Sequence, residues 1–122
     1  MVKEDLNLLV VGIGSIGRRH SDVLYSSLGC RDITIWDPIH ERAIEHAAKY
    51  PGMKTVATFE EGLQQKPDAV FICSPPALHM PQAEKAILAG CHVMVEKPLA
   101  LNLESLEKVK KLAEEKNRMV SV

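Results

Sequence analysis

Short apolar runs alternate with amphipathic stretches along the whole chain. Six runs have the apolar, β-branched composition of buried strands: residues 6–12, 32–37, 54–58, 68–74, 91–97 and 118–122. Five stretches between them repeat apolar residues at helical spacing: residues 15–29, 39–50, 59–66, 78–90 and 101–117. The pattern therefore predicts strands and helices in alternation.

Residues at the ends of these segments fit the same interpretation. Gly29 and Gly90 stand where helices would stop, and Asn102 stands where an N-cap would precede the last helix. Nearly continuous apolar strands joined by helices indicate a parallel sheet that is covered on both faces. We predict an α/β fold of the Rossmann type: a doubly wound, mostly parallel six-stranded sheet with helices on both faces.

Composition limits what such a domain can do. The chain has 122 residues, 46% of them hydrophobic, so we predict one domain over residues 1–122. The net charge of −1 gives no sign of a nucleic-acid or membrane partner. The apolar run after the N-terminal charges is too short for a signal-peptide core or a bilayer span, so we expect a cytoplasmic protein.

The cysteines and histidines do not form a metal-binding pattern. Cys30, Cys73 and Cys91 are widely spaced, with no CxxC pair, which favours reduced and mostly buried thiols. The five histidines show no HExxH spacing. No metal site is predicted.

A glycine motif follows the first predicted strand directly and precedes a helix. Gly12 permits a tight turn, Gly14 lets the backbone approach a pyrophosphate, and Gly17 allows close helix–strand packing. The amides of Ser15 and Ile16 would face the phosphates at the helix N-terminus. The context favours dinucleotide binding, although the same glycines can simply form a turn or bind a methyl donor.

The second predicted strand ends in an acid that tests this interpretation. Asp37 lies twenty residues after Gly17, where a carboxylate accepts hydrogen bonds from the adenosine ribose. A 2′-phosphate would meet its negative charge, which favours NAD over NADP, although Arg42 or His40 could reach such a phosphate. Asp37 could also cap the helix that follows Pro38.

The fourth and fifth predicted strands end in further candidate residues. Residues 74–79, S-P-P-A-L-H, lie at the edge of the sheet where α/β folds place ligands. Their two prolines would form a rigid wall beside a ring or ribose, or an ordinary turn, and His79 could cap, pack or bind. Residues 96–98, E-K-P, follow the fifth strand.

Taken together, four motifs resemble one enzyme family. G-I-G-S-I-G-R-R-H at 12–20, W-D-P at 36–38, S-P-P-A-L-H at 74–79 and E-K-P at 96–98 are similar to those of the Gfo/Idh/MocA oxidoreductases, named for glucose-fructose oxidoreductase and inositol dehydrogenase. The resemblance covers the whole chain and implies the family's N-terminal dinucleotide-binding domain.

The resemblance also implies roles for individual residues. It implies that Lys97 is a catalytic residue that takes or gives the proton of a sugar hydroxyl. Burial would help the lysine take a proton, and a nearby carboxylate would hold its side chain in place. The Lys97–Pro98 bond would be cis as a hypothesis. The cofactor-binding residues are Gly12, Gly14, Ser15, Ile16 and Gly17 at the pyrophosphate, Asp37 at the ribose, Ser74, Pro75 and His79 along the cofactor, and Glu96 and Lys97 beside the nicotinamide.

The chain departs from the family in its length. Members continue into a C-terminal substrate and oligomerisation domain that supplies an Asp and a His, and this chain has no matching positions. It is expected to be a domain of a longer enzyme or, as the alternative, a natural short protein. The apolar edge at residues 118–122 could form a homo-oligomer.

Three functions remain open from the sequence. The leading one is the NAD-binding part of an oxidoreductase that acts on a secondary alcohol of a sugar or polyol, incomplete for catalysis alone. The second is a non-catalytic NAD-binding or redox-sensing module, which does not need Lys97. The third is a fold that binds a methyl donor, which leaves E-K-P unexplained.

Overall fold

The computed structural model describes residues 6–122, so the first five residues of the predicted domain lie outside it. Six strands form one sheet in the order β3-β2-β1-β4-β5-β6, and every neighbouring pair is parallel. This confirms the predicted sheet. The strands are β1 (Asn7–Val11), β2 (Asp32–Trp36), β3 (Lys54–Thr55), β4 (Ala69–Ile72), β5 (His92–Val95) and β6 (Val120–Ser121).

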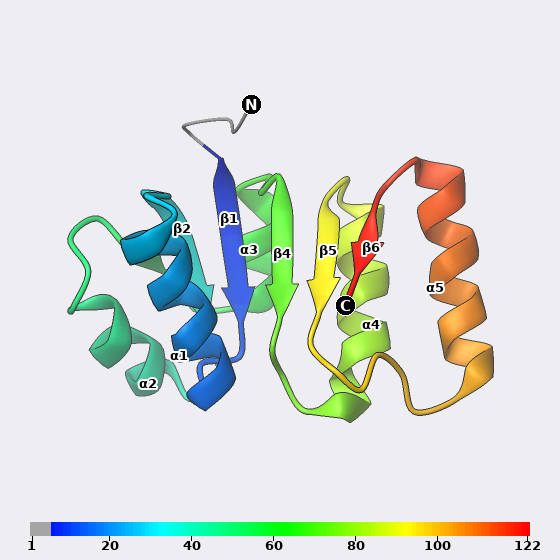
Figure 1. Ribbon diagram of the computed structural model, residues 1–122, viewed down its shortest axis with the longest axis horizontal. Coiled ribbons are helices and arrows are strands. Elements are labelled where there is room, and N and C mark those ends of the chain that lie inside the picture. Colours follow the sequence, from blue (N-terminus) through cyan, green and yellow to red (C-terminus); the bar gives the residue numbers. More distant parts are fainter. Residues whose placement is uncertain (1–5) are drawn as a thin grey trace.

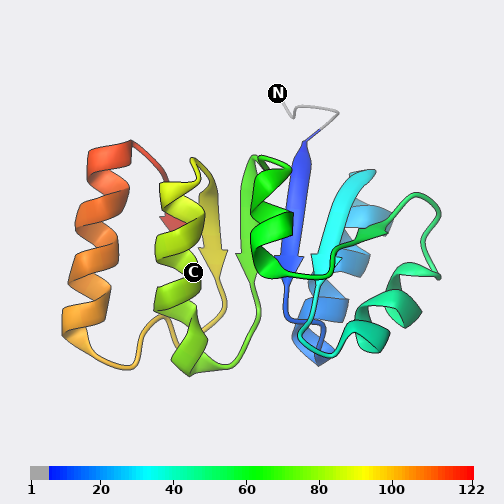
Figure 2. The ribbon, with the colours of Figure 1, turned by 180° about the vertical axis from the view of Figure 1, so that it is seen from behind.

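Helices lie on both faces of the sheet, as the sequence predicts, although none lies in front of β4, β5 and β6 in Figure 1. The helices α1 and α2 lie on the face seen in Figure 1, and α3, α4 and α5 lie on the opposite face, which Figure 2 shows from the front. The helices are α1 (Ser15–Asp22), α2 (His40–Ala47), α3 (Phe59–Gln64), α4 (Pro76–Leu88) and α5 (Leu103–Lys116). A π-helical turn, η1 (Val23–Ser27), extends α1.

Two apolar cores follow from the alternation of side chains along the strands. Leu8 and Val10 of β1 join the core under α1 and α2, whereas Leu9 and Val11 join the core under α3, α4 and α5. β1 and β2 are therefore buried on both sides, which explains why their sequences read as continuous apolar runs, whereas alternate residues of β4 are only partly buried.

The predicted helix ends are confirmed. Gly29 and Gly90 adopt φ angles of 73° and 91°, which glycine adopts without a steric penalty. The side chain of Asn102 accepts a hydrogen bond from the amide of Ser105 and so caps α5.

The strand order reverses between β1 and β4. From β1 the chain continues into α1 on one face, and from β4 it continues into α4 on the other. The loops at the carboxyl ends of these two strands therefore diverge, and an open α/β sheet binds its ligands in the crevice that this leaves. Over residues 6–122, no helix is long and apolar enough to cross a membrane.

Candidate cofactor-binding site

A cavity of about 370 Å³ lies at this switch point, along the carboxyl ends of β2, β1 and β4. Seven of the residues predicted to bind the cofactor contribute to its wall. They are Gly12, Gly14, Ser15, Ile16, Asp37, Ser74 and Pro75. The glycine motif, Asp37 and the S-P-P stretch, far apart along the chain, thus form one site, whereas Gly17, His79, Glu96 and Lys97 do not line this cavity.

Two glycines of the motif have a steric reason to be glycine, and the third borders the open cavity. Gly12 has φ +89°, and an added Cβ would lie 2.8 Å from the backbone nitrogen of Ser74. At Gly17 an added Cβ would lie 1.7 Å from the carbonyl oxygen of Gly12, so only glycine lets α1 pack this closely on the loop. At Gly14 nothing lies within 4 Å, and this open space is part of the cavity wall.

The N-terminus of α1 faces the same cavity. Ser15 and Ile16 are the first two residues of this helix, and no side chain caps it. Within residues 6–122 no hydrogen bond uses either of their amides. Unpaired helix N-terminal amides stabilise a bound anion such as a pyrophosphate. The open space at Gly14 and these two amides therefore fit the phosphates of a dinucleotide.

Asp37 joins the glycine loop to the start of α2. One carboxylate oxygen accepts a hydrogen bond from the amide of Ile13 at 2.7 Å, and the other accepts one from the amide of Ile39 at 2.8 Å. The bond to Ile39 lies just before α2, where the sequence allowed a capping role. Each oxygen keeps a second lone pair, so a ribose hydroxyl can still donate to it.

Arg42 is the cation closest to this acid. Its Nη1 atom lies 3.7 Å from the carboxylate of Asp37, and both residues line the cavity. Arg42 thus partly balances the negative charge of Asp37, which was expected to repel a 2′-phosphate. The rest of the wall was not assigned to the cofactor from spacing: Trp36, Pro38, Ile39, Cys73, Leu78 and Gln82 also line the cavity.

The structure places His79 behind the cavity and not on its wall. The side chain is 1% exposed. Its Nδ1 lies 2.8 Å from the carbonyl oxygen of Pro98, and its Nε2 lies 2.7 Å from that of Ser74. A neutral imidazole donates to one of these carbonyls, and an imidazolium donates to both. His79 therefore links the Ser74 loop to the E-K-P segment.

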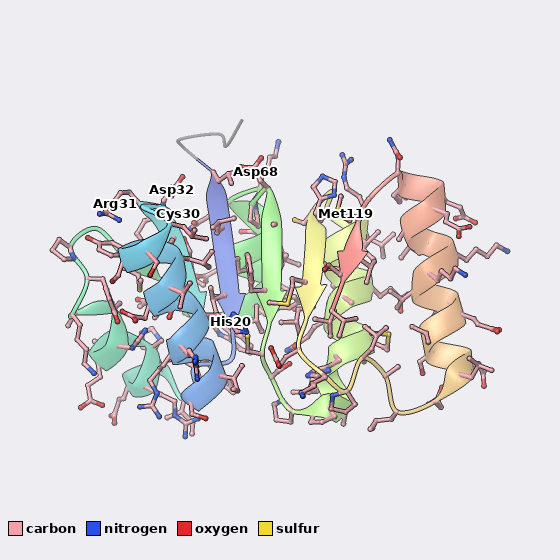
Figure 3. All side chains as sticks on the ribbon, viewed as in Figure 1. His20, Cys30, Arg31, Asp32, Asp68 and Met119 are labelled. Carbon is pink, nitrogen blue, oxygen red and sulfur yellow. The ribbon has the colours of Figure 1, made fainter. Side chains whose placement is uncertain are left out.

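Glu96 and His20 form a pair that the sequence did not predict. His20 Nε2 lies 2.9 Å from Glu96 Oε2, and its ring also contacts Phe71 of β4. Figure 3 shows His20 between α1 and the carboxyl end of the sheet. The pair connects α1 to the end of β5. It also gives Glu96 a partner other than Lys97.

Lys97 is exposed. The expectation that Lys97 is buried is therefore wrong within this domain. Within residues 6–122, Lys97 also makes no ion pair with Glu96. Lys97 follows β5 at the same edge of the sheet as the cavity, next to Glu96, whose amide bonds to the carbonyl of Ile72 at 2.9 Å. The Lys97–Pro98 peptide bond is cis, as hypothesised.

The cysteines are unsuited to thiol chemistry. Burial and then the nearby Glu96 raise the pKa of Cys73 to about 12. Burial likewise raises the pKa of Cys91 to about 11, and Cys30 is 8% exposed. Because the thiolate is the reactive form, the native thiols are expected to be inert.

We predict that a thiol reagent such as Ellman's reagent reacts with the native chain at pH 8 at least ~100-fold more slowly than with the unfolded chain, because Cys73 and Cys91 hold so little thiolate and Cys30 is buried. Absorbance of the released chromophore measures both rates. If one thiol of the native chain reacted at the rate of free cysteine, the prediction would be contradicted.

The sequence profile of GFO_IDH_MocA, an oxidoreductase family with an NAD-binding Rossmann fold, matches residues 6–122. The chain belongs to the Gfo/Idh/MocA family. This confirms the predicted family and fold, and it confirms NAD as the family's cofactor. No residue-level role follows from the match.

Individual relatives of this Gfo/Idh/MocA chain are much longer. It is 34% identical to 4-carboxy-2-hydroxymuconate-6-semialdehyde dehydrogenase of Sphingobium sp., covering 90% of this chain and 35% of the relative. It is 32% identical to inositol 2-dehydrogenase of Rhodococcus erythropolis, covering 84% and 30%. The crystal structure of GenD2 from gentamicin A biosynthesis, in complex with NAD, superposes with a TM-score of 0.87 at 27% identity, covering 99% and 35%. The chain thus spans about a third of these proteins.

Proposed function

We propose that residues 1–122 form the NAD-binding domain of an oxidoreductase that interconverts a secondary alcohol of a sugar or polyol with a ketone. The observation that carries this proposal is the spatial order of the motifs along one edge of the sheet. Asp37, the glycine loop, Ser74 and Glu96 follow β2, β1, β4 and β5, which are consecutive neighbours. Three strand spacings of about 4.8 Å separate the outer two.

This order matches the parts of an extended dinucleotide. Asp37 binds the adenosine ribose, the amides of Ser15 and Ile16 bind the pyrophosphate, and Ser74 and Pro75 line the path across β4. Glu96 and Lys97, after β5, border the nicotinamide. His79 is assigned a supporting role, because it holds the loop of Ser74 through the backbone.

In the proposed enzyme, some of the groups needed for catalysis lie in this domain and others lie in the rest of a longer protein. When bound, NAD accepts a hydride from the alcohol carbon or returns one to the ketone. Lys97 takes or gives the proton of the hydroxyl group. Because Lys97 is exposed here, residues beyond this domain are needed to enclose the reacting centre and to select the substrate. A cytoplasmic location and a homo-oligomer through β6 stay predictions.

Cofactor binding is tested by titrating the chain with NADH while recording energy transfer from Trp36, the single tryptophan, which lines the cavity. We expect saturable binding by the parent chain. In Gly14→Ala we expect binding at least ~10-fold weaker, because the added methyl group occupies the space that the pyrophosphate needs. Folding should be unaffected, since the backbone at Gly14 has φ −79° and no atom within reach.

Lys97→Ala is the matched variant for the catalytic assignment. It should bind NADH within about twofold of the parent, since the dinucleotide is held mainly by backbone groups. In a longer version of the protein that turns over a polyol, the same change should lower kcat far more than it changes KM. Absence of NADH binding by the parent chain would overturn the proposed function. Unchanged kcat would instead contradict the catalytic assignment of Lys97.

A further inference from the structure

His20 of α1 and Glu96, which follows β5, form a pair on the open side of the sheet. His20 Nε2 lies 2.9 Å from Glu96 Oε2, and 33% of the His20 side chain and 27% of the Glu96 side chain are exposed. No helix lies in front of β4, β5 and β6 in Figure 1. The pair is therefore accessible to a ligand that extends across the carboxyl ends of β4 and β5.

The histidine holds one oxygen of the carboxylate and leaves the other free. An ionised carboxylate only accepts hydrogen bonds, so His20 donates from Nε2. Its ring in turn contacts Phe71 of β4, at a centroid distance of 6.3 Å. Within residues 6–122, no hydrogen bond uses Glu96 Oε1, and no lysine or arginine forms an ion pair with Glu96. Glu96 is therefore a carboxylate held in one position, with a free oxygen and no lysine or arginine to balance its charge.

The charge of Glu96 acts on the wall of the candidate cofactor site. Ile72 of β4 lies beside Val95 of β5, so Cys73 and Glu96 come next at two adjacent strand ends. Cys73 lines the cavity. Burial and then the negative charge of Glu96 raise the pKa of the Cys73 thiol to about 12. A charge that disfavours a thiolate at this wall favours a cation there.

The oxidised and reduced forms of the cofactor differ in charge only at the nicotinamide. The ring carries one positive charge in NAD⁺ and none in NADH, whereas the adenosine and the pyrophosphate are the same in both. Asp37 and the glycine loop therefore do not distinguish the two forms. A carboxylate beside the nicotinamide does, because it attracts the charged ring and not the neutral one.

We propose that Glu96 raises the affinity of the domain for NAD⁺ relative to NADH, and that His20 is the positioning residue that holds the carboxylate in place. This inference rests on the proposed function, since it places the nicotinamide beside Glu96. Tighter binding of NAD⁺ shifts the equilibrium between the bound cofactors toward reduction of the ketone, in which the carbonyl carbon receives the hydride and the oxygen receives the proton.

The test measures the dissociation constants of NAD⁺ and NADH by calorimetry under the same conditions and compares their ratio between variants. Glu96→Gln keeps the size of the side chain and an acceptor for His20, but removes the charge. We expect it to weaken NAD⁺ binding relative to NADH binding roughly fivefold, because the charge is partly exposed and therefore screened. For a two-electron couple, this shift equals about 20 mV. Glu107→Gln is the control, because Glu107 is exposed on α5 and does not line the cavity.

Two variants of His20 test its positioning role. In His20→Ala the carboxylate loses its donor and turns toward water, which screens its charge, so we expect the relative affinity for NAD⁺ to fall at least ~twofold. His20→Gln should keep the parental ratio, because its amide nitrogen donates to Glu96 in place of Nε2. Equal loss in both variants would overturn the role of this hydrogen bond.

The outcome for Glu96→Gln decides the inference as a whole. A ratio equal to that of the parent chain, with both forms bound, would overturn the inference and leave the proposed function standing. So would an equal change of the ratio in Glu107→Gln, since any lost negative charge would then have the same effect. A parent chain that binds neither NAD⁺ nor NADH would overturn the proposed function itself.

Discussion

Replacing Gly17 with alanine is expected to destabilise the domain more than the same replacement at Gly12 or Gly14. The new Cβ would lie 1.7 Å from the oxygen and 2.8 Å from the carbon of the Gly12 carbonyl. Both contacts are with backbone, so no side-chain rotation relieves them. We expect the free energy of unfolding to fall by about 3 kcal/mol or more, since overpacking against backbone forces the loop and α1 apart.

Urea denaturation followed by circular dichroism measures this loss. Gly14→Ala is the matched control, because the same change at Gly14 meets no atom within 4 Å and its backbone angles suit alanine. It should alter the free energy of unfolding by less than about 1 kcal/mol. If Gly17→Ala were as stable as Gly14→Ala, the described packing of α1 on the loop would be incorrect.

Asp37→Ala is expected to impair both folding and cofactor binding. The carboxylate holds the amides of Ile13 and Ile39, and its removal leaves two amide donors without an acceptor. The buried Ile13 amide costs about 1–3 kcal/mol when it is left unsatisfied, and the part-buried Ile39 amide costs less, so we expect a loss of roughly 2–4 kcal/mol. We also expect NADH binding to weaken at least ~10-fold, because the ribose loses its acceptor and the glycine loop loses its anchor.

Asp32→Ala is the control for this prediction. Asp32 starts the same strand and pairs with Lys54 at 2.8 Å, but this ion pair is exposed. Its removal should cost less than about 1 kcal/mol and leave NADH binding unchanged. The account of Asp37 would be contradicted if the two variants unfolded at the same urea concentration.

Much of the fold could be predicted because it depends on local patterns. Each predicted strand and helix is present, since apolar periodicity records which faces are buried. The glycine loop and the acid after β2 could also be found, because a phosphate-binding turn restricts the residue type at each of its positions. The capping role of Asn102 could be predicted because it also depends on a local sequence pattern.

The errors and omissions concern contacts between residues far apart in the chain. A nearby carboxylate was expected to hold Lys97, whereas the adjacent Glu96 pairs with His20, 76 residues away. His79 was placed on the cofactor path, whereas its ring bonds to two backbone carbonyls, a fact that depends on where the Pro98 segment folds back. The small cavity that Arg18, Arg42 and Lys49 line between α1 and α2 could likewise not be predicted, because it depends on how these two helices pack.

The central claim is that a dinucleotide binds across β2, β1, β4 and β5 on backbone groups of the glycine loop. The most direct measurement is a titration of the ¹⁵N-labelled chain with NADH, followed by two-dimensional NMR of its backbone amides. The account predicts that the largest shifts occur at Ser15 and Ile16, with smaller shifts at Ser74 and Glu96, and none in helix α5, which does not line the cavity. Shifts confined to α5, or no shifts at saturating NADH, would contradict it.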